Sequence, residues 1–305
     1  MPTMFNVNGR ICAEEDATIS VLDHGFLYGE GVYEVCRTYG GQPFLFDRHL
    51  RRMRQSADLI ALPVPFSDQE LAGRVDDTLE AAELDGSDAP SAYVRILLTR
   101  GVGELNYDPA SCAQPSLVII AKRHVSPSRD IYELGVRVAL VPVVRNLPAS
   151  VNPLIKSNNL LNNALAMQHA LKSGAFEAVM RNHRGELAEC SQSNLFIVRG
   201  GAVLTPPLEA GLLAGITREY VFEIGRTLGI QVAEAPLHDV DLLEADEAFL
   251  TSTTREIVPI VLVDDRRVGS GHPGSTTRAL LDTYRQHTAA STRGGRGSQT
   301  PAFSA

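Results

Sequence analysis

GVYEVCRTYGGQPFLFDRHLRRMRQSA, residues 31–57, decides the fold of the N-terminal part of the chain. Its first nine residues, Gly31–Tyr39, are rich in β-branched and aromatic side chains and predict a strand. Gly40 and Gly41 follow, and two consecutive glycines are typical of a tight hairpin turn. We therefore expect the chain to reverse there, with Gln42–Phe46 as the partner strand.

The end of this stretch and the residues after it predict two helices. Asp47 is placed to cap the first helix, whose apolar side chains recur on one stripe at Leu50, Met53, Ala57 and Ile60. Ser67 and Glu70 form the Ser-x-x-Glu pattern of a capping box, which predicts a second helix ending at about Glu83. Two further strands are predicted at Ser91–Thr99 and Ser116–Ala121.

Two of the predicted strands carry tyrosine and arginine on one face, because side chains alternate between the two faces of a strand. In the first strand that face holds Tyr33, Val35, Arg37 and Tyr39. In the strand Ser91–Thr99 it holds Tyr93, Arg95 and Leu97. Such a face is either an exposed sheet surface or the wall of a pocket that receives a carboxylate, and the pattern leaves both possibilities open.

A polar, aperiodic segment around Pro127 divides the chain into two parts. We predict an α/β (α+β) protein with an N-terminal domain over residues 1–122, a linker over 123–132, a C-terminal domain over 133–288 and a disordered tail over 289–305. The expected strands of the second domain are Gly135–Val144, Glu177–Arg181, Leu195–Arg199, Ala202–Leu204 and Ala248–Leu250. Its expected helices are Asn158–Ser173 and Thr217–Leu228, the latter followed by a capping Gly229.

Composition excludes several classes of function. The 305 residues carry a formal net charge of −8, which argues against a nucleic-acid binder that neutralises phosphates. No apolar run approaches the ~18–20 residues of a membrane helix, and the first residues lack the basic and apolar regions of a signal peptide, so we expect a cytoplasmic protein without membrane contact. The spacing of the cysteines and histidines matches no metal-binding motif, and we expect no metal.

Lysine occurs at only three positions, Lys122, Lys156 and Lys172, so any lysine chemistry has three candidates. Lys156 follows the apolar run NPLI and precedes the helix expected from Asn158. Apolar neighbours and a positive helix end would favour the neutral amine, which a Schiff-base nucleophile requires. A surface lysine in a loop is the competing interpretation.

Three further segments are candidate binding sites. Gly211–Thr217 leads into a helix whose first free backbone N–H groups could receive an anion, and TSTT at 251–254 gathers hydroxyls after a strand. Glu189 follows a hairpin expected at 182–185. The helix after Asp47 adds Arg48, Arg51, Arg52 and Arg54, among which periodicity does not choose; a solvated basic face is the default.

Seven blocks of the chain together carry a family resemblance. They are VLDHGFLYGEGVYEV (21–35), FDRHLRRMRQSA (46–57), AYVRILLTRGVGELNYDP (92–109), IKSNNLLNNALA (155–166), ELAECSQSNLFIV (186–198), LLAGITRE (212–219) and FLTSTTREIVP (249–259). In this order they resemble the class IV (fold type IV) aminotransferases, which include branched-chain aminotransferases, D-amino-acid transaminases and aminodeoxychorismate lyase. The resemblance implies a small N-terminal α/β domain, a larger C-terminal pseudo-barrel domain and pyridoxal 5'-phosphate as cofactor.

Position by position, the resemblance implies a role for each candidate residue. Lys156 would be the Schiff-base lysine, Glu189 the partner of the pyridine nitrogen, and Leu213 would pack on the cofactor ring. The cofactor phosphate would be held by Arg52, Gly215, Ile216, Thr217 and Thr253. The substrate would contact Tyr33, Arg37, Tyr93, Arg95 and Thr254.

The same resemblance implies amino transfer from L-branched-chain amino acids to 2-oxoglutarate, although KSNNLL (156–161) and TSTTREI (251–257) look more like the D-amino-acid and lyase subgroups. Tyr33 and Val35 stand where branched-chain enzymes usually have Phe and Gly. The Arg-x-His element with which D-amino-acid transaminases bind the α-carboxylate is absent, and GVGELNYDP (101–109) occupies that loop. The alternatives are a D-amino-acid or (R)-amine transaminase, an aminodeoxychorismate lyase, and an inactive protein that binds a phosphate ligand.

Family members complete each active site with a loop from the neighbouring subunit. A homodimer or larger homo-oligomer is therefore implied, with the loop near Gly101–Tyr107.

Overall fold

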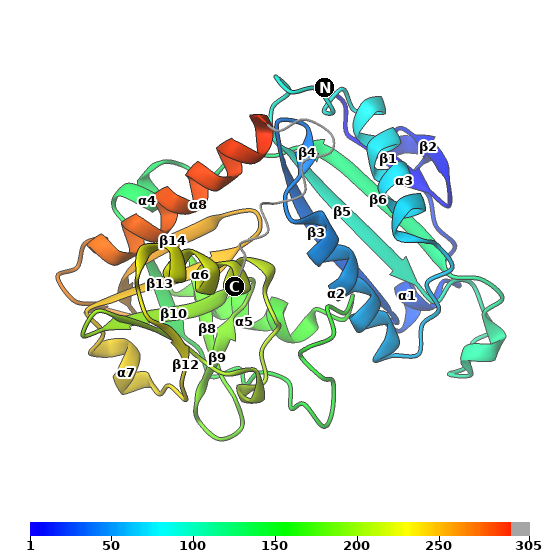
Figure 1. Cartoon of the computed structure of the whole chain (residues 1–305). Coiled ribbons are helices and arrows are strands. Elements are labelled where there is room, and N and C mark those ends of the chain that lie inside the picture. Colours follow the sequence, from blue (N-terminus) through cyan, green and yellow to red (C-terminus); the bar gives the residue numbers. More distant parts are fainter. Residues whose placement is uncertain (294–305) are drawn as a thin grey trace. The chain divides into compact units, whose positions relative to one another are not determined.

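The computed structural model describes residues 1–293 and divides the chain into two compact units (Figure 1). The first unit consists of Met1–Val125, the short segment Ile155–Asn159 and residues 287–293. The second consists of Ser126–Leu154 and Leu160–Gln286. Ile155–Asn159 thus packs with the first unit, whereas the sequence had placed it inside the second domain.

The first unit is built on a six-stranded antiparallel sheet in the order β2-β1-β6-β5-β3-β4. Its strands are β1 (Met4–Val7), β2 (Arg10–Cys12), β3 (Gly31–Tyr39), β4 (Gln42–Pro43), β5 (Ala92–Thr99) and β6 (Ser116–Arg123). The prediction for β3 is confirmed over its whole length, and Gly40 and Gly41 form the turn with positive φ. The partner strand is shorter than predicted, because the chain turns into a helix at Phe46.

Two helices, α2 (Phe46–Asp58) and α3 (Asp68–Ala81), pack on one face of this sheet, and the short α1 (His24–Leu27) precedes β3 (Figure 1). The predicted cap of α2 is wrong by two positions: Leu45, with φ 53°, is the N-cap, and Asp47 lies in the first turn, where a negative charge is still favourable. The capping box of α3 is confirmed, since Ser67 and Glu70 bond reciprocally. The core between the layers includes Leu50, Met53, Leu71, Leu79, Val94, Ile96 and Ile119.

The second unit contains a mixed nine-stranded sheet in the order β12-β11-β10-β13-β14-β7-β8-β9, with β15 added on β14. Its strands are β7 (Val136–Leu140), β8 (Glu177–Arg181), β9 (Leu187–Cys190), β10 (Asn194–Arg199), β11 (Ala202–Thr205), β12 (Val232–Glu234), β13 (Glu247–Ser252), β14 (Glu256–Val263) and β15 (Arg266–Arg267). Its helices are α4 (Asp130–Glu133), α5 (Leu161–Lys172), α6 (Ile216–Leu228) and α7 (Asp239–Leu243), and α8 (Ser275–Arg293) follows β15.

Two predictions for this half of the chain are corrected. The helix expected from Asn158 begins at Leu161, because the residues before it pair with β3 instead. Residues 289–293 of the expected disordered tail are helical instead: α8 continues to Arg293, and Ala289 and Ala290 are strong helix formers. Residues 294–305, the rest of the predicted tail, lie outside the described residues. Among residues 1–293 no helix has the length and apolar character to span a membrane.

Candidate active site

Lys156 lies in a segment that adds to the edge of β3. Tyr33 N donates to Lys156 O at 2.9 Å and Asn158 N donates to Gly31 O at 2.9 Å, which gives an antiparallel bridge between Val32 and Ser157. Lys156 N also donates to Ser56 Oγ of α2 at 3.1 Å. The lysine backbone is therefore fixed by a strand and a helix, whereas the sequence had suggested an adjacent helix start.

The side chain of Lys156 points to the face of the sheet that carries Tyr33. Its Nζ lies 4.5 Å from the centroid of the Tyr33 ring, and Arg95 Cζ lies 4.1 Å from the same centroid. The register of β3 and β5 explains this meeting, because Val35 pairs with Arg95 and places Arg95 next to Tyr33 on one face. An amine and a guanidinium thus share one aromatic ring.

The same face continues along the two strands to Arg37 and Tyr93, which pair directly across the ladder. Arg37 is buried, with Cζ 4.7 Å from the Tyr39 ring centroid. Tyr93 is half-buried, and Lys122 Nζ lies 5.4 Å from its ring. The predicted Arg-Tyr face therefore exists in the first unit and is at least partly covered along its length.

The opposite face of β3 holds a buried cluster of charged side chains. Glu34, which is 0% exposed, accepts hydrogen bonds from Arg52 Nε at 2.7 Å and Arg52 Nη2 at 2.8 Å. His49 Nδ1 lies 2.7 Å from the same carboxylate. His49 and Arg52 are three residues apart on α2, so both reach β3 from one side of the helix.

The charges of this cluster follow from its burial and its pairing. Burial by itself would raise the pKa of Glu34, but the charge of Arg52 and the hydrogen bonds from Arg52 and His49 hold it well below its usual range, so the carboxylate is ionised. Burial lowers the pKa of His49, against the opposing effect of Glu34. Burial disfavours the charged form of Arg52, yet Glu34 raises its pKa. At neutral pH the cluster holds one negative carboxylate, one positive guanidinium and a neutral imidazole.

Glu34 and His49 were missed by the sequence reasoning. Glu34 lies on the strand face that alternation predicts to be buried, between Val32 and Cys36, and a carboxylate there needs a partner. This signal was available from the sequence. It does not choose among the arginines of α2, because only the structure shows that Arg52 is the buried one.

In the second unit, Glu189 of β9 lies at the centre of a hydrogen-bonded cluster. Its Oε1 accepts from Arg145 Nε at 2.7 Å, and its Oε2 accepts from Leu213 N at 3.0 Å. Asn194 Nδ2 donates to the same Oε2 at 3.4 Å and to Leu213 O at 2.9 Å. Arg145 and Asn194 are the residues missed here; Arg145 lies 44 residues from Glu189, and no local pattern signals the contact.

The turn at Leu213 leads directly into α6. Gly215 is its N-cap, and an added Cβ would lie 1.9 Å from Asn194 Oδ1, so only glycine fits. No side chain caps the helix, which leaves the backbone N–H groups at Ile216 and Thr217 without intrahelical acceptors. The helix N-terminus at Ile216 and Thr217 is joined to the Glu189 cluster through Asn194 and Leu213, and its binding of an anion stays a prediction.

Thr253 and Thr254 lie in the turn between β13 and β14, and both are half-buried. At the end of β13, Thr251 pairs with Asn194 of β10. Its Oγ1 is buried and has no hydrogen-bond partner within the described part of the chain. This turn therefore adjoins the strand that carries Asn194.

The predicted loop at Gly101–Tyr107 lies in the first unit and exposes apolar side chains. Leu105 is 72% exposed and Tyr107 is 86% exposed. The neighbouring segment before and within α1 is also apolar and exposed, and its backbone pairs with the loop between Asp23 and Val102. The exposed apolar residues of the two segments are Ile19, Val21, Leu22, Phe26, Val102, Leu105 and Tyr107.

Each unit contains a different set of chemically reactive or charged groups. The first holds an amine, an aromatic face with arginines and a buried guanidinium; the second holds a fixed carboxylate and a helix N-terminus suited to an anion. In the first unit the amine can bind a carbonyl; in the second, the carboxylate can pair with a protonated ring nitrogen and the free N–H groups can bind a phosphate.

Comparison with known families gives a match over most of the chain. The family described as Amino-transferase class IV matches residues 31–263. A protein of Methanocaldococcus jannaschii named "Putative branched-chain-amino-acid aminotransferase" is 38% identical over 280 residues, covering 92% of this chain and 94% of that protein. A D-alanine aminotransferase of Listeria monocytogenes is 35% identical over 281 residues (90% and 92% covered), and an aminodeoxychorismate lyase of Bacillus subtilis is 30% identical over 284 residues (93% and 94% covered).

Solved structures give the same result. The branched-chain amino acid aminotransferase of Escherichia coli aligns with a TM-score of 0.89 and 28% identity, covering 96% of this chain and 97% of that one. The T.th. enzyme of the same name, complexed with N-(5'-phosphopyridoxyl)-L-glutamate, aligns with a TM-score of 0.87 and 28% identity over 94% of each chain. A structure of that enzyme with pyridoxamine 5'-phosphate has a TM-score of 0.88, at 28% identity and the same coverage.

Proposed function

This chain belongs to the class IV aminotransferases, and from that premise we propose that it transfers the amino group of L-branched-chain amino acids to 2-oxoglutarate with pyridoxal 5'-phosphate as cofactor. One observation carries the proposal furthest. Lys156 Nζ and the Arg95 guanidinium lie over the same Tyr33 ring, so the reactive amine and a partner for a second substrate carboxylate share one wall.

The cofactor, when bound, supplies an electron-withdrawing ring that stabilises negative charge at the substrate Cα. Lys156 would hold the cofactor through its carbonyl, and the Nζ amine would act as the acid and base that moves the proton at the substrate Cα. The backbone bonds of Lys156 to Tyr33 and Ser56 hold the start of this side chain in place, so the amine moves only through its own flexible stem.

Glu189 is assigned to the pyridine nitrogen, because a carboxylate there keeps that nitrogen protonated. Its bonds to Arg145, Asn194 and Leu213 fix its orientation. Leu213, in the same turn, is the residue assigned to the ring face.

The phosphate is assigned to Arg52, to the N–H groups of Gly215, Ile216 and Thr217, and to Thr253. A guanidinium held by a carboxylate fork and a helix start without a side-chain cap are both suited to a dianion.

Substrate recognition is assigned to the Arg-Tyr face of the first sheet and to Thr254. Leucine and valine need apolar walls, and glutamate needs a partner for its second carboxylate. Tyr33 and Tyr93 supply ring surface, and Arg95 and Arg37 supply guanidinium groups.

The 38% identity to the branched-chain protein over 92% of the chain supports this substrate class. D-alanine is the second candidate, because the D-alanine enzyme of Listeria monocytogenes is nearly as similar. Against it stands the loop GVGELNYDP, which lacks the Arg-x-His element of that subgroup. The lyase alternative differs in its reaction, because a lyase would release its keto product without an oxo-acid acceptor.

The enzyme acts as a homodimer. The exposed apolar residues of segments 19–26 and 102–107 form a patch of a kind that soluble monomers rarely leave uncovered. A second copy of this chain is its occupant, and the loop Gly101–Tyr107 then contributes to the active site of the neighbouring subunit.

A half-reaction assay tests the proposed function. Purified enzyme is mixed with L-leucine, L-glutamate, D-alanine or an (R)-amine, and the visible absorbance of the cofactor is followed. L-leucine and L-glutamate should discharge the band fastest; faster discharge by D-alanine would overturn the substrate assignment. Borohydride reduction should leave the cofactor on Lys156, and an adduct on Lys122 or Lys172 would overturn the role of Lys156.

A further inference from the structure

The first sequence block of the family, residues 21–35, contains Asp-His-Gly and Glu30, and the proposed function uses neither. Both lie beneath the long connection from β5 to β6, residues 100–115, which contains the exposed Leu105 and Tyr107. A connection of this length with only one short 3₁₀ turn, Pro109–Ser111, is usually functional and needs contacts that hold it.

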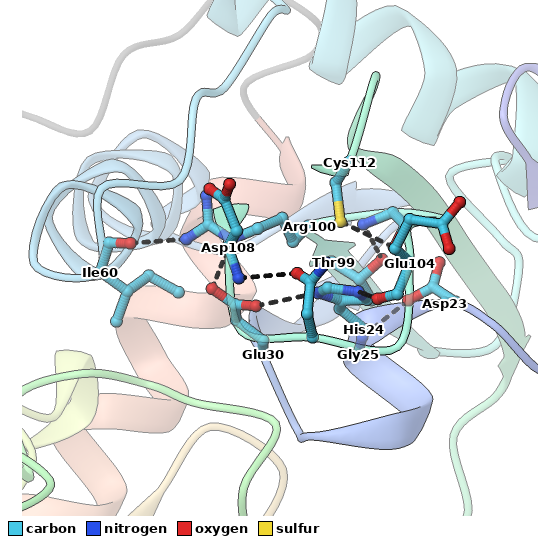
Figure 2. Close-up of polar contacts among 12 residues, drawn as sticks. Asp23, His24, Gly25, Glu30, Ile60, Thr99, Arg100, Glu104, Asp108 and Cys112 are labelled. Carbon is cyan, nitrogen blue, oxygen red and sulfur yellow. Dashed lines mark hydrogen bonds and ion pairs between the residues drawn. The ribbon is translucent and has the colours of Figure 1, made fainter. Parts of the chain in front are cut away.

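The base of the loop is fixed by backbone bonds to this block. His24 N donates to Gly101 O at 2.9 Å, and Gly103 N donates to Leu22 O at 3.3 Å. Asp23 contributes through its side chain: Oδ1 caps α1 at Gly25 N, and Oδ2 accepts from the Thr99 hydroxyl at 2.9 Å (Figure 2).

The His24 ring lies against the inner side of the loop and is 0% exposed. Its Nε2 lies 2.9 Å from the carbonyl oxygen of Glu104, and since a carbonyl only accepts, Nε2 carries the hydrogen (Figure 2). The ring also packs edge-on against Tyr28 at 4.9 Å, and Tyr28 packs on Tyr107 at 5.0 Å. His24 therefore reaches the loop directly at Glu104 and through Tyr28 at Tyr107.

The loop packs tightly against this imidazole at Gly103. A Cβ added at Gly103 would lie 2.9 Å from His24 Nε2 and 2.6 Å from Cys112 Sγ. The other side of the ring faces Glu30, whose Oε2 lies 3.5 Å from His24 Nδ1.

Arg100 fixes the start of the loop to the rest of the unit. Its Nε donates to Glu30, and its Nη2 and Nη1 donate to the carbonyls of Ile60 at 2.7 Å and Ala61 at 3.1 Å, at the end of α2 (Figure 2). Glu30 is thus placed between the arginine and the histidine, and its carboxylate contacts both.

We propose that His24 is a positioning residue for substrate binding: its bond to the Glu104 carbonyl holds the loop 101–107 in the conformation that the neighbouring subunit's active site requires. The inference rests on the proposed homodimer. It assigns His24 an effect on the KM of the neighbouring subunit's active site, because the loop that His24 holds is the one proposed to contribute to that site.

Two variants of His24 separate the effect of its hydrogen bond to Glu104 from the effect of having any polar side chain at this position. In His24→Gln the amide nitrogen can take the place of Nε2 and donate to Glu104 O, whereas in His24→Asn the side chain is too short to do so. We expect His24→Asn to speed hydrogen exchange at the Gly103 amide and raise KM for both substrates by roughly 10-fold each, the scale of one lost buried hydrogen bond, with kcat changed less than about 2-fold. His24→Gln should stay near wild type, and His183→Asn, in an exposed turn of the second unit, is the control.

A hybrid dimer tests whether the effect crosses to the other subunit. Co-expression with two affinity tags gives a dimer of one Lys156→Ala subunit and one His24→Asn subunit. The one subunit that keeps Lys156 is the one that carries His24→Asn. Its active site is completed by the loop of the other subunit, in which His24 is intact, so we expect the wild-type KM. The reverse hybrid, with both substitutions in one subunit, should show the raised KM.

Each contrary result has a separate meaning. Unchanged exchange at Gly103 in His24→Asn, or a raised KM in the first hybrid, overturns the inference. A monomeric active enzyme overturns the proposed dimer even if His24→Asn loosens the loop. If His24→Asn fails to fold, Gly103→Ala replaces it, since the added Cβ pushes the loop off the same imidazole and should give the same KM and hybrid pattern; a wild-type KM in that variant would equally count against the inference.

Discussion

Replacing Glu34 by Gln should destabilise the protein strongly, although the two side chains have nearly the same shape. The carboxylate is fully buried and receives two hydrogen bonds from Arg52 and one contact from His49. A neutral amide leaves the guanidinium of Arg52, 7% exposed, without its counter-charge. Breaking a buried ion pair by removing one partner costs about 3–5 kcal/mol, and because Gln can still accept one hydrogen bond we expect about 3 kcal/mol.

The pH dependence of this loss has a definite sign. The pKa of Glu34 is lower in the folded protein than its ordinary value of 4.5. Such a group contributes its full stability above the pKa of the unfolded chain and loses it as pH falls toward the folded pKa. The stability difference between wild type and Glu34→Gln should therefore be constant between about pH 6 and 8 and shrink below about pH 4.5.

Urea unfolding followed by far-UV circular dichroism measures this difference, which suits a chain without tryptophan. The control is Asp68→Asn, which removes the partner of Arg54 in an exposed ion pair of the same unit. An exposed pair is worth about 1 kcal/mol or less, so this variant should unfold close to wild type. Equal losses for the two variants, or a Glu34→Gln loss that grows as pH falls below about 4.5, would refute the charge-pairing argument.

Three further predictions concern the proposed chemistry. Glu189→Gln should keep the cofactor but lower kcat by roughly 10²-fold, the scale of one lost charge-stabilising group, and unchanged turnover would move the role of Glu189 elsewhere. Arg95→Leu should raise KM for L-glutamate and 2-oxoglutarate by about 10-fold or more and leave L-leucine little changed, because a bond to a charged group is worth about 1.5–3 kcal/mol; equal effects on both donors would contradict the assignment. Sedimentation should find a dimer at assay concentrations, and Tyr107→Glu, which puts a charge in the exposed apolar patch, should weaken it; an active monomer would contradict the prediction.

The strands and helices with strong local patterns were predictable from the sequence. Gly31–Tyr39 is rich in β-branched and aromatic side chains and is followed by two glycines, and it forms β3 over that whole range. Ser67 and Glu70 form a capping box that predicts the start of α3 from neighbouring residues alone, and the structure confirms it. The Arg-Tyr face was also predictable, because side chains alternate between the two faces of each strand. Only the register, in which Val35 pairs with Arg95, required the folded sheet.

What could not be predicted depends on contacts between distant residues. The region around Lys156 looked like the start of a helix, but a hydrogen bond to Tyr33, more than a hundred residues earlier, draws it into an extended segment. The partnership of Arg145 with Glu189 is likewise a tertiary contact. Glu34 is different, because its burial was readable from alternation and only its partners on α2 required the fold.

The pairing of Ile155–Asn159 with β3 has a consequence for how the enzyme is made. The part of β3 near Tyr33 has an open edge until residue 159 has left the ribosome, because that segment is its partner there. The first 125 residues can form their helices and most of their sheet earlier, since those contacts lie within them. Lys156 therefore reaches its place only when about half of the chain has been synthesised, and an N-terminal fragment that folds early lacks this lysine.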